Sequence, residues 1–334
     1  MKTWKALIAA LVLGALPAGV RAEVSELKIP LGAGGFGFLP LNMMQKHGLI
    51  EKYAEEAGLK VKVNWANIGG PAVMNDALLS GSAHFISAGP PAFLTLWDRT
   101  RGNIGVKSIG AISSMPMSLN ARVSDLKDLD SISGSQKIAV TSVKVSIPSI
   151  IMQMYALKKY GKEQVFRFDP YTVTMAHPEA LITLTSGSGT IVGHWASAPF
   201  DQRELKNPAI KTIMNSDDVM GGSTTFTMMS TTSRFQSENP KVFGAVVKAL
   251  KRAQEMIAED KKAAAAVLLE AMGGKGWSVE ELVEILNEPG TKYTMKPENV
   301  LTYANFMHEI GSLKNKAAGL NDLFFDNPDV AGGN

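Results

Sequence analysis

A similar short segment occurs twice in this sequence: His84-Phe85-Ile86-Ser87-Ala88-Gly89-Pro90 and His194-Trp195-Ala196-Ser197-Ala198-Pro199. Each copy follows a Ser-Gly-Ser triplet, at residues 80–82 and 186–188. Each is typical of a buried strand that ends in a small polar turn. The repetition predicts two similar α/β lobes that face each other, and a cleft between two lobes is a common place for a small molecule to bind.

Strand and helix patterns alternate around the first copy. Alternating apolar residues predict strands near 27–31, 61–65 and 84–87, and helical patterns follow near 39–47, 71–81 and 90–97. This order predicts a parallel sheet with helices on both faces.

A second unit of the same kind begins near Leu119. Strands are expected near 137–141, 165–168, 190–195 and 210–214, and Ser146 is expected to cap a helix that stops at Gly161. From Pro240 the pattern changes to amphipathic helices near 241–257, 263–272 and 279–286, the last with Ser278 as its cap. These helices are expected to return and cover the first lobe.

The predicted fold class is therefore α/β with two lobes, each a mostly parallel sheet flanked by helices, and a ligand cleft between them. The first lobe is expected to comprise residues 23–115 and 224–334, and the second residues 116–223.

The N-terminus has the pattern of a secretory signal, expected over residues 1–22. Lys2 and Lys5 precede an uncharged apolar run at 6–16, and Val20-Arg21-Ala22 fits a cleavage site before Glu23. The apolar run is too short to span a bilayer. The mature chain is therefore expected to be soluble and exported to the periplasm.

Composition excludes several classes of protein. The chain has no cysteine, so disulfides, thiolate metal sites, cysteine nucleophiles and a lipid-modified cysteine are all excluded. Removing the three basic residues of the signal leaves 31 basic against 31 acidic side chains. A neutral chain without a basic run gives no electrostatic reason to bind nucleic acid or anionic lipid.

The turns beyond the strands carry the candidate ligand site. Gly- and Ser-rich turns at 34–37, 69–70, 87–89, 142–146 and 197–199 fall where ligands bind in open α/β sheets. Their backbone N–H groups lie near helix N-termini and favour an anionic or strongly polar group. The candidate ligand-binding residues are Gly35, Phe36, Gly37, Gly70, Ser87, Ala88, Gly89, Ser142, Lys144, Ser146, His194 and Ser197.

The Gly-rich turn at 32–37 also fits the spacing of a dinucleotide-binding loop, and Glu51, Glu55 and Glu56 lie at the distance of an acidic ribose partner. Export separates the chain from dinucleotides, so we favour a loop that approaches a ligand and expect no cofactor. Phe36 fits either a ligand contact or core packing.

The remaining polar candidates have plainer alternatives. His84 is better explained by core packing, whereas packing and ligand contact are balanced for His194, and neither has a carboxylate at metal-ligand spacing. No metal site is expected. Ser87 and Ser197 lack a nucleophile elbow and are read as hydrogen-bonding groups. Lys144 fits a solvated lysine and a ligand contact equally well.

Several segments together resemble the periplasmic substrate-binding proteins of ABC importers, specifically the nitrate/sulfonate/taurine family. The likeness covers roughly residues 27–271. The matching pieces are the Ser80-Gly81 turn with its strand and Gly89-Pro90 loop, Ser124-Asp125-Leu126-Lys127-Asp128-Leu129, Ala176-His177-Pro178-Glu179-Ala180-Leu181, the stretch from His194 to Pro199-Phe200, and Asn239-Pro240. Where many members have acidic residues after the Ser-Gly turn, this chain has Ser82 and His84, so the family's ligands are not carried over.

The resemblance implies a periplasmic binding protein fold and a non-enzymatic role. The chain is expected to act as a monomer that captures a small sulfonate, carboxylate or related oxyanion and delivers it to an inner-membrane ABC permease with its ATPase. One alternative is an exported enzyme acting on a small metabolite, for which no nucleophile–base pair or metal cluster is found at usable spacing. Another is a periplasmic sensor subunit, which a neighbouring permease gene would distinguish. The pyrimidine-precursor synthases of the family use cysteine, which this chain lacks.

Overall fold

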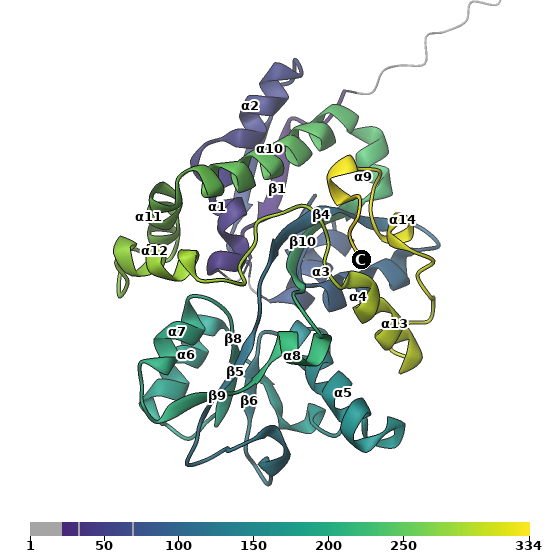
Figure 1. The fold of residues 1–334 in the computed structure, drawn as a ribbon. Helices are drawn as coiled ribbons and strands as arrows, with labels where there is room; N and C mark the ends of the chain where they lie inside the picture. Colours follow the sequence, from purple (N-terminus) through teal and green to yellow (C-terminus); the bar gives the residue numbers. More distant parts are fainter. Residues whose placement is uncertain (1–21, 33, 69) are drawn as a thin grey trace, which may run out of the picture.

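The computed structural model describes residues 22–32, 34–68 and 70–334. The chain forms two α/β lobes, one above the other in Figure 1, with the mostly teal second lobe below. The predicted signal lies outside the described residues apart from Ala22. No helix within the described ranges is both long and apolar enough to cross a membrane.

The first lobe contains two small sheets. A parallel pair is formed by β1 (Glu26–Pro30) and β2 (Lys62–Ala66), and β10 (Thr225–Thr232) runs antiparallel between β3 (Ile86–Ala88) and β4 (Val106–Ser114). Four helices of this lobe lie between its strands in the sequence: α1 (Leu39–Lys46), α2 (Leu49–Glu56), α3 (Pro71–Leu79) and α4 (Pro90–Thr100).

The second lobe is built on one five-stranded sheet. Its strands, in spatial order, are β7 (Thr172–Thr174), β6 (Ile138–Val140), β8 (Gly193–Ala196), β5 (Ser118–Arg122) and β9 (Ile210–Asn215). β6 pairs in parallel with both β7 and β8, whereas β5 runs antiparallel to β8 and β9. Its helices are α5 (Ile147–Tyr160), α6 (His177–Ser186), α7 (Phe200–Leu205) and α8 (Ser216–Met220).

Two segments connect the lobes. β4 continues through residues 115–117 into β5, and α8 leads through residues 221–224 into β10. Met117 and Ser216 hold these segments together: Met117 N–H donates to Ser216 Oγ and Ser216 N–H donates to Met117 O, both at 2.9 Å. The two strands that follow the crossings, β5 and β10, run antiparallel to their neighbours. The β3–β10–β4 sheet is therefore antiparallel and the five-stranded sheet is mixed, while the expected parallel pairing is found for β1 with β2 and for β6 with β7 and β8.

The C-terminal part returns to the first lobe, as expected from its amphipathic pattern. Its helices are α9 (Ser233–Glu238), α10 (Pro240–Glu259), α11 (Lys261–Ala271), α12 (Val279–Asn287), α13 (Val300–Glu309) and α14 (Leu320–Leu323). α10 packs across α1 and α2 (Figure 1). Ser278 caps α12 by accepting a 3.1 Å hydrogen bond from Glu281 N–H, which confirms its predicted role.

The predicted strand at 165–168 is wrong. The segment forms turns that lead into a 3-10 turn at Asp169–Tyr171, and the strand β7 follows it. Val165 and Phe168 are both buried while Phe166 is exposed. This three-residue spacing belongs to a helical turn, and the short apolar run imitated a strand. Other 3-10 turns occur at Phe36–Phe38, Leu129–Ser131, Lys162–Gln164 and Pro328–Val330.

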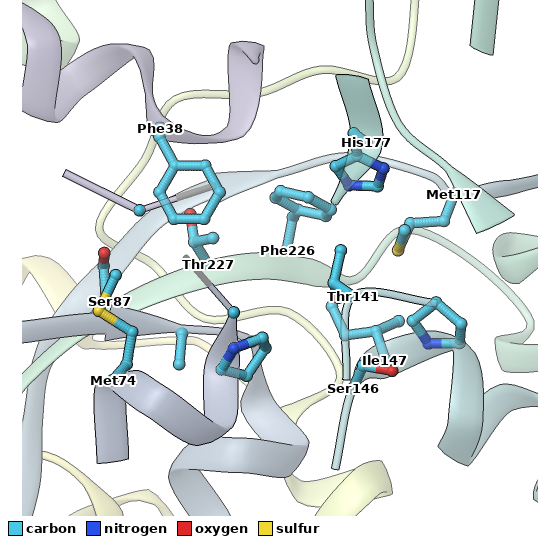
Figure 2. Close-up of a pocket in the computed structure, with 16 residues that line it drawn as sticks. Phe38, Met74, Ser87, Met117, Thr141, Ser146, Ile147, His177, Phe226 and Thr227 are labelled. Carbon is cyan, nitrogen blue, oxygen red and sulfur yellow. The ribbon is translucent and has the colours of Figure 1, made fainter. Parts of the chain in front are cut away.

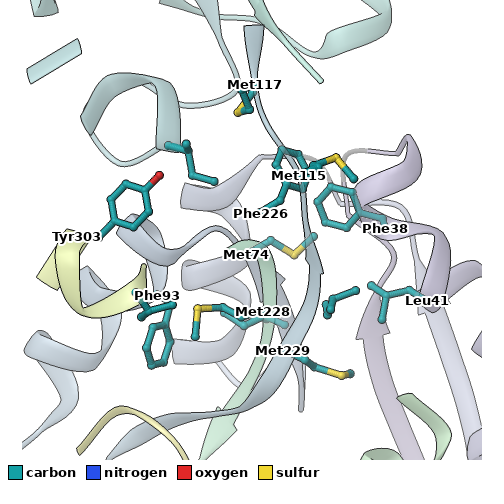
Figure 3. Packing of buried hydrophobic residues seen from close by; sticks show 14 of the residues in the cluster. Phe38, Leu41, Met74, Phe93, Met115, Met117, Phe226, Met228, Met229 and Tyr303 are labelled. Carbon is teal, nitrogen blue, oxygen red and sulfur yellow. The ribbon is translucent and has the colours of Figure 1, made fainter. Parts of the chain in front are cut away.

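A continuous core runs from the first lobe to the crossing segments. Phe38 and Phe226 meet edge to face with ring centroids 6.2 Å apart, and Met74, Met115 and Met117 lie around them (Figure 3). Unbranched methionine side chains adapt to irregular gaps. The core therefore has an adaptable part where the two lobes join.

Candidate functional site

A cavity of about 40 Å³ lies between the two lobes, beside the crossing segments (Figure 2). Its described lining residues are Gly32, Phe38, Gly70, Pro71, Met74, Ser87, Ala88, Gly89, Met117, Thr141, Ser146, Ile147, Pro148, His177, Phe226 and Thr227. A buried water needs roughly 10–15 Å³ of such cavity volume. The space holds only a few waters, so a larger molecule can enter only if the lobes move apart.

Four helices begin at the wall of this cavity, two from each lobe. α3 and α4 start at Pro71 and Pro90, and α5 and α6 start at Ile147 and His177. None of the four residues at the N-cap positions of these helices accepts a capping hydrogen bond with its own side chain. In the first turn of α3, Ala72 N–H has a weak 3.5 Å hydrogen bond to Ser142 Oγ of the other lobe. A helix N-terminus carries partial positive charge and N–H groups without intrahelical partners. The four ends together favour negative charge in the cavity.

The Ser87 side chain lies at the end of β3 and is among the side chains that line the cavity (Figure 2). Its residue is 2% exposed, and its Oγ has no hydrogen-bond partner in the described part of the chain. A buried hydroxyl left without a partner costs about 1–3 kcal/mol. A polar ligand atom in the cavity would remove this cost.

His177 is linked through a buried chain to a carboxyl group. His177 Nδ1 lies 2.9 Å from His194 Nε2, and His194 Nδ1 lies 2.5 Å from Glu204 Oε1. The other carboxyl oxygen, Oε2, accepts a 3.0 Å hydrogen bond from Asn120 Nδ2. The His177 ring stacks on Phe200 at 5.3 Å between centroids. Three elements, α6, β8 and α7, thus bring one connected set of groups to the cavity.

Burial shifts the pKa values of Glu204, His194 and His177 in the direction that favours the neutral form of each group. Burial raises the pKa of Glu204 to about 8, against the opposing hydrogen bond from Asn120. It lowers the pKa of His194 to about 3 and the pKa of His177 well below its usual value, and His194 lowers the latter further. Near neutral pH the carboxyl group keeps its proton and both rings are uncharged.

The rest of the cavity wall is uncharged and mostly apolar, with hydroxyl groups at Thr141, Ser146 and Thr227. None of its described lining residues is Asp, Glu, Lys or Arg. Phe38, Met74, Met117, Ile147 and Phe226 supply most of the side-chain surface (Figure 2). An anion here meets helix ends and neutral hydrogen-bonding groups, and an apolar part of the same molecule would meet these five side chains.

Five of the residues singled out in the sequence line the cavity. They are Gly70, Ser87, Ala88, Gly89 and Ser146. Ser146 occupies the N-cap position of α5, as predicted, but its Oγ lies 3.2 Å from Ser149 Oγ and does not cap the helix.

The other seven lie elsewhere. Gly35 and Phe36 contact the second lobe through Ala198, Gly37 lies under the Phe226 ring, and Ser142 lines an outer groove. Lys144 is exposed beside Gln153 and Asp169 in a separate pocket. His194 lies behind His177, and Ser197 is buried in the turn before α7, where its carbonyl accepts from Phe200 and Asp201 N–H.

Sequence reasoning did not select His177, Thr141 or Phe226 as site residues, although all three line the cavity. His177 had a usable signal, because His177-Pro178 opens a helix directly after a strand, the same arrangement as at Pro71 and Pro90. Phe226 had none, since its position depends on how β10 crosses between the lobes.

A larger groove of about 810 Å³ continues from the cavity to the surface. It shares Gly32, Gly70 and Thr141 with the cavity, and Val73 and Ile182 stand exposed on opposite lobes along it. The groove offers a route between solvent and the cavity.

Direct contacts hold the lobes together around this groove. Arg203 of α7 pairs with Glu281 of α12 at 2.8 Å and stacks on Trp277, with its guanidinium carbon 3.9 Å from the ring centroid. Ala72 N–H donates to Ser142 Oγ at 3.5 Å. The structure therefore represents a closed arrangement.

Sequence comparison identifies a family. The model of the family described as NMT1-like matches residues 36–272. No curated protein matches the chain in sequence.

Solved structures give the same architecture. The alkanesulfonate-binding protein SsuA from Xanthomonas axonopodis pv. citri, bound to MOPS, is 14% identical with a TM-score of 0.66, covering 90% of this chain and 98% of its own. The nitrate-binding protein NrtA from Synechocystis PCC 6803 is also 14% identical with a TM-score of 0.66, covering 90% and 84%. The aliphatic sulphonate binding protein SsuA from Escherichia coli is 16% identical with a TM-score of 0.61, covering 93% and 96%. The predicted two-lobed binding-protein fold is confirmed.

Proposed function

The chain belongs to the NMT1-like family, and on that premise we propose that it captures a small organic oxyanion between its lobes and delivers it to an inner-membrane ABC permease with its ATPase. The fold of sulfonate- and nitrate-binding proteins supports this role. Closure of the two lobes around the oxyanion would create the surface that the permease recognises.

The observation that carries the proposal is the convergence on one cavity of four helix N-termini, none of which is capped by the side chain of its own N-cap residue. Each helix end contributes about 0.3–1 kcal/mol to holding a negative charge, and up to about 2 kcal/mol when partly buried. The unpartnered hydroxyl of Ser87 adds a hydrogen-bonding group. Without a Lys or Arg among the described lining residues, this arrangement suits a single negative charge better than two.

The apolar wall indicates the rest of the molecule. Phe38, Met74 and Phe226 would contact a hydrocarbon or aromatic body, while the head group faces the helix ends. We therefore propose a monoanionic sulfonate or carboxylate with an apolar body. The residues proposed to touch it are Gly70, Ser87, Ala88, Gly89, Ser146 and His177.

The protein is proposed to act as a periplasmic monomer after removal of residues 1–22. We place the cut directly before Glu23. Its two carboxylate oxygens accept 3.0 and 2.8 Å hydrogen bonds from Lys241 and Val242 N–H at the start of α10, so Glu23 belongs to the folded part of the chain. We place the lobe boundaries at 115/116 and 223/224, within the two crossing segments.

A thermal-shift screen of sulfonates, carboxylates and nitrate tests the function. A compound present at about 100 times its Kd stabilises the folded state by roughly 2.7 kcal/mol. For a chain of this size, that raises Tm by several degrees, since about 1 kcal/mol shifts Tm by roughly 2–4 °C. Turnover of a metabolite without any stabilising anion would contradict the proposal and favour an exported enzyme.

A further inference from the structure

The buried chain from Glu204 through His194 to His177 ends at the cavity, and no step of simple capture requires it. Glu204 and His194 are fully buried, and His177 is 1% exposed. His194 uses both ring nitrogens, Nδ1 towards Glu204 and Nε2 towards His177, and His177 uses Nδ1 towards His194. Only the Nε2 atom of His177 is left without a hydrogen bond among the described residues. The His177 ring lies among the lining side chains, near Phe226 (Figure 2).

We propose that Glu204, His194 and His177 form a proton-conducting hydrogen-bonded chain that sets whether His177 offers the bound oxyanion a hydrogen-bond donor. Binding then requires that Glu204, at the buried end of this hydrogen-bonded chain, is protonated. The inference rests on the proposed function, because it concerns the same cavity and the same anion.

The polarity follows from the two nitrogen atoms of each neutral imidazole, one of which donates while the other accepts. When Glu204 is protonated, its O–H donates to His194 Nδ1, His194 Nε2–H donates to His177 Nδ1, and His177 carries its proton on Nε2. When Glu204 is ionised, it accepts from His194 Nδ1–H, His194 Nε2 accepts from His177 Nδ1–H, and His177 Nε2 is an acceptor. One proton at the buried end therefore reverses the group presented at the cavity.

Asn120 fixes which carboxyl oxygen can hold the proton. Its Oδ1 accepts a 2.7 Å hydrogen bond from Thr212 Oγ1, which orients its Nδ2 towards Glu204 Oε2. Because Oε2 accepts from Asn120, the acid proton belongs on Oε1, 2.5 Å from His194 Nδ1. The proton thus lies at the start of the chain.

The switch point falls in an accessible pH range. Burial raises the pKa of Glu204 to about 8, so the donor form predominates at pH 7 and the acceptor form at pH 9. A carboxylate in an apolar interior is unfavourable without a paired cation. The two rings remain neutral throughout this range, because burial lowers the pKa of His194 to about 3 and the pKa of His177 well below 6.5.

Ionisable groups near Glu204, His194 and His177 determine which variant can serve as a control for the pH dependence. Asp201, one turn before Glu204 on α7, has its pKa raised to about 7 by burial and by Glu204. The first turns of α3, α4 and α5, which face His177 across the cavity, carry no acidic or basic residue. Glu288 accepts a 2.9 Å hydrogen bond from Gln202 Nε2 of α7 and also raises the pKa of Asp201. Further ionisable groups on α7 and on the elements packed against it are Arg203 and Lys206, paired with Glu281, Arg122, paired with Asp125, and the exposed Glu179 and Lys211.

Calorimetric titration with benzenesulfonate at pH 7 and pH 9 tests the linkage. If only protein with protonated Glu204 binds benzenesulfonate, the apparent Kd rises about tenfold from pH 7 to pH 9. The reason is that the fraction of protein with protonated Glu204 falls by that factor around a pKa of about 8. Titrations at pH 9 in buffers of different ionisation enthalpy should show uptake of nearly one proton. An unchanged Kd with no proton uptake would overturn the inference while leaving the proposed function standing.

Glu204→Gln is the matched variant, because its amide can place the N–H donor at the Oε1 position and the acceptor oxygen at Oε2. The chain is then held in the donor form, so Kd should stay at its pH 7 value up to pH 9. Asp201→Asn removes the neighbouring titration and should keep the loss of affinity between pH 7 and pH 9, with its midpoint at a lower pH because one negative charge near Glu204 is gone. If the tenfold loss of affinity between pH 7 and pH 9 persists in Glu204→Gln, or disappears in Asp201→Asn, the proton belongs to another group. Either result refutes the proposed role of the Glu204–His194–His177 hydrogen bonds.

Nitrogen-15 NMR of histidine-labelled wild-type protein provides a readout that needs neither a ligand nor a variant. His177 and His194 should carry their protons on Nε2 at pH 7 and on Nδ1 at pH 9. If the tautomers switch but no anion binds at either pH, the Glu204–His194–His177 hydrogen-bonded chain moves a proton as proposed and the proposed function is wrong. If neither ring changes tautomer, the inference is refuted.

Discussion

The backbone N–H of Phe36 donates a 3.1 Å hydrogen bond to the carbonyl oxygen of Ala198, joining a turn of the first lobe to the segment before α7 in the second. The preceding residue, Gly35, has φ +79, and a Cβ atom there would lie 2.9 Å from Ala198 O. The absence of a side chain at Gly35 allows the two backbones to approach when the lobes are closed.

Gly35→Ala should therefore weaken binding of benzenesulfonate. The added methyl group crowds the Ala198 carbonyl only in the closed arrangement, and such overpacking costs about 1–3 kcal/mol, or roughly five- to 150-fold in Kd. Calorimetry measures the affinity, and small-angle scattering should show a more open molecule.

Gly34→Ala is the control for backbone strain. Gly34 also has a positive φ, of +83, but a Cβ atom there meets nothing within 4 Å. It should lower the stability of the fold by about 1–2 kcal/mol, as expected for a side chain in the left-handed region, without changing affinity. Equal loss of affinity in both variants would contradict a specific role for the Phe36–Ala198 contact.

Ser87→Ala should reduce affinity without destabilising the free protein. The hydroxyl has no partner in the described structure, so its removal costs the folded chain nothing, whereas the bound anion loses a donor. The expected loss is about 1–3 kcal/mol, or roughly five- to 150-fold in Kd. Thermal unfolding and calorimetry measure the two effects separately.

Ser197→Ala is the matched control, since Ser197 occupies the equivalent place in the second segment but does not line the cavity. Its affinity should equal that of the wild type. If Ser197→Ala weakens binding and Ser87→Ala does not, the cavity between the lobes is not the ligand site.

Glu23→Ala should destabilise the mature chain. Its carboxylate accepts hydrogen bonds from two N–H groups at the start of α10, and loss of an N-terminal cap costs about 0.5–2 kcal/mol. Urea unfolding measures the change. Glu55→Ala, at an exposed position on α2, should have little effect, and N-terminal sequencing of the exported wild type should begin at Glu23.

Stability should fall as pH rises from 6.5 to 8. The folded-state pKa of Glu204 is raised to about 8 and that of Asp201 to about 7, so in this range the folded chain holds protons that the unfolded chain has lost. Each such proton lowers stability by about 1.4 kcal/mol per pH unit. The lowered pKa of His194, about 3, acts in the opposite direction but only below about pH 6.5.

Urea unfolding at pH 6.5 and pH 8 measures this dependence. Glu204→Gln should remove the part due to Glu204, and Asp201→Asn should remove only the smaller part due to Asp201. A wild-type stability that rises over this range would show that Glu204 is ionised in the folded chain.

Local sequence determined the α/β rhythm, the positions of most helices and five of the cavity residues. Gly70, Ser87, Gly89 and Ser146 were predictable because a strand end followed by a helix N-terminus is specified within a few residues. The same local reasoning failed at 165–168, where a short apolar run fits a strand and a helical turn equally well.

Tertiary structure decided which of these turns meet. Lys144 and Ser146 belong to one turn, yet Lys144, with φ +66, stands exposed beside Asp169 while Ser146 lines the cavity. The two similar segments also differ in the folded chain: Ser87 reaches the cavity and Ser197 does not.

The chain from Glu204 to His177 was likewise beyond sequence reasoning. Its three members come from α7, β8 and α6, and their contact depends on the register of β8 against β5 and on how the helices pack over that sheet. Local propensity acts over a few neighbouring residues, whereas strand register and helix packing are set by contacts between distant parts of the chain. The sequence by itself therefore determined where helix ends and small polar residues occur, and only the packing of the two lobes decided that they surround one cavity backed by a buried carboxyl group.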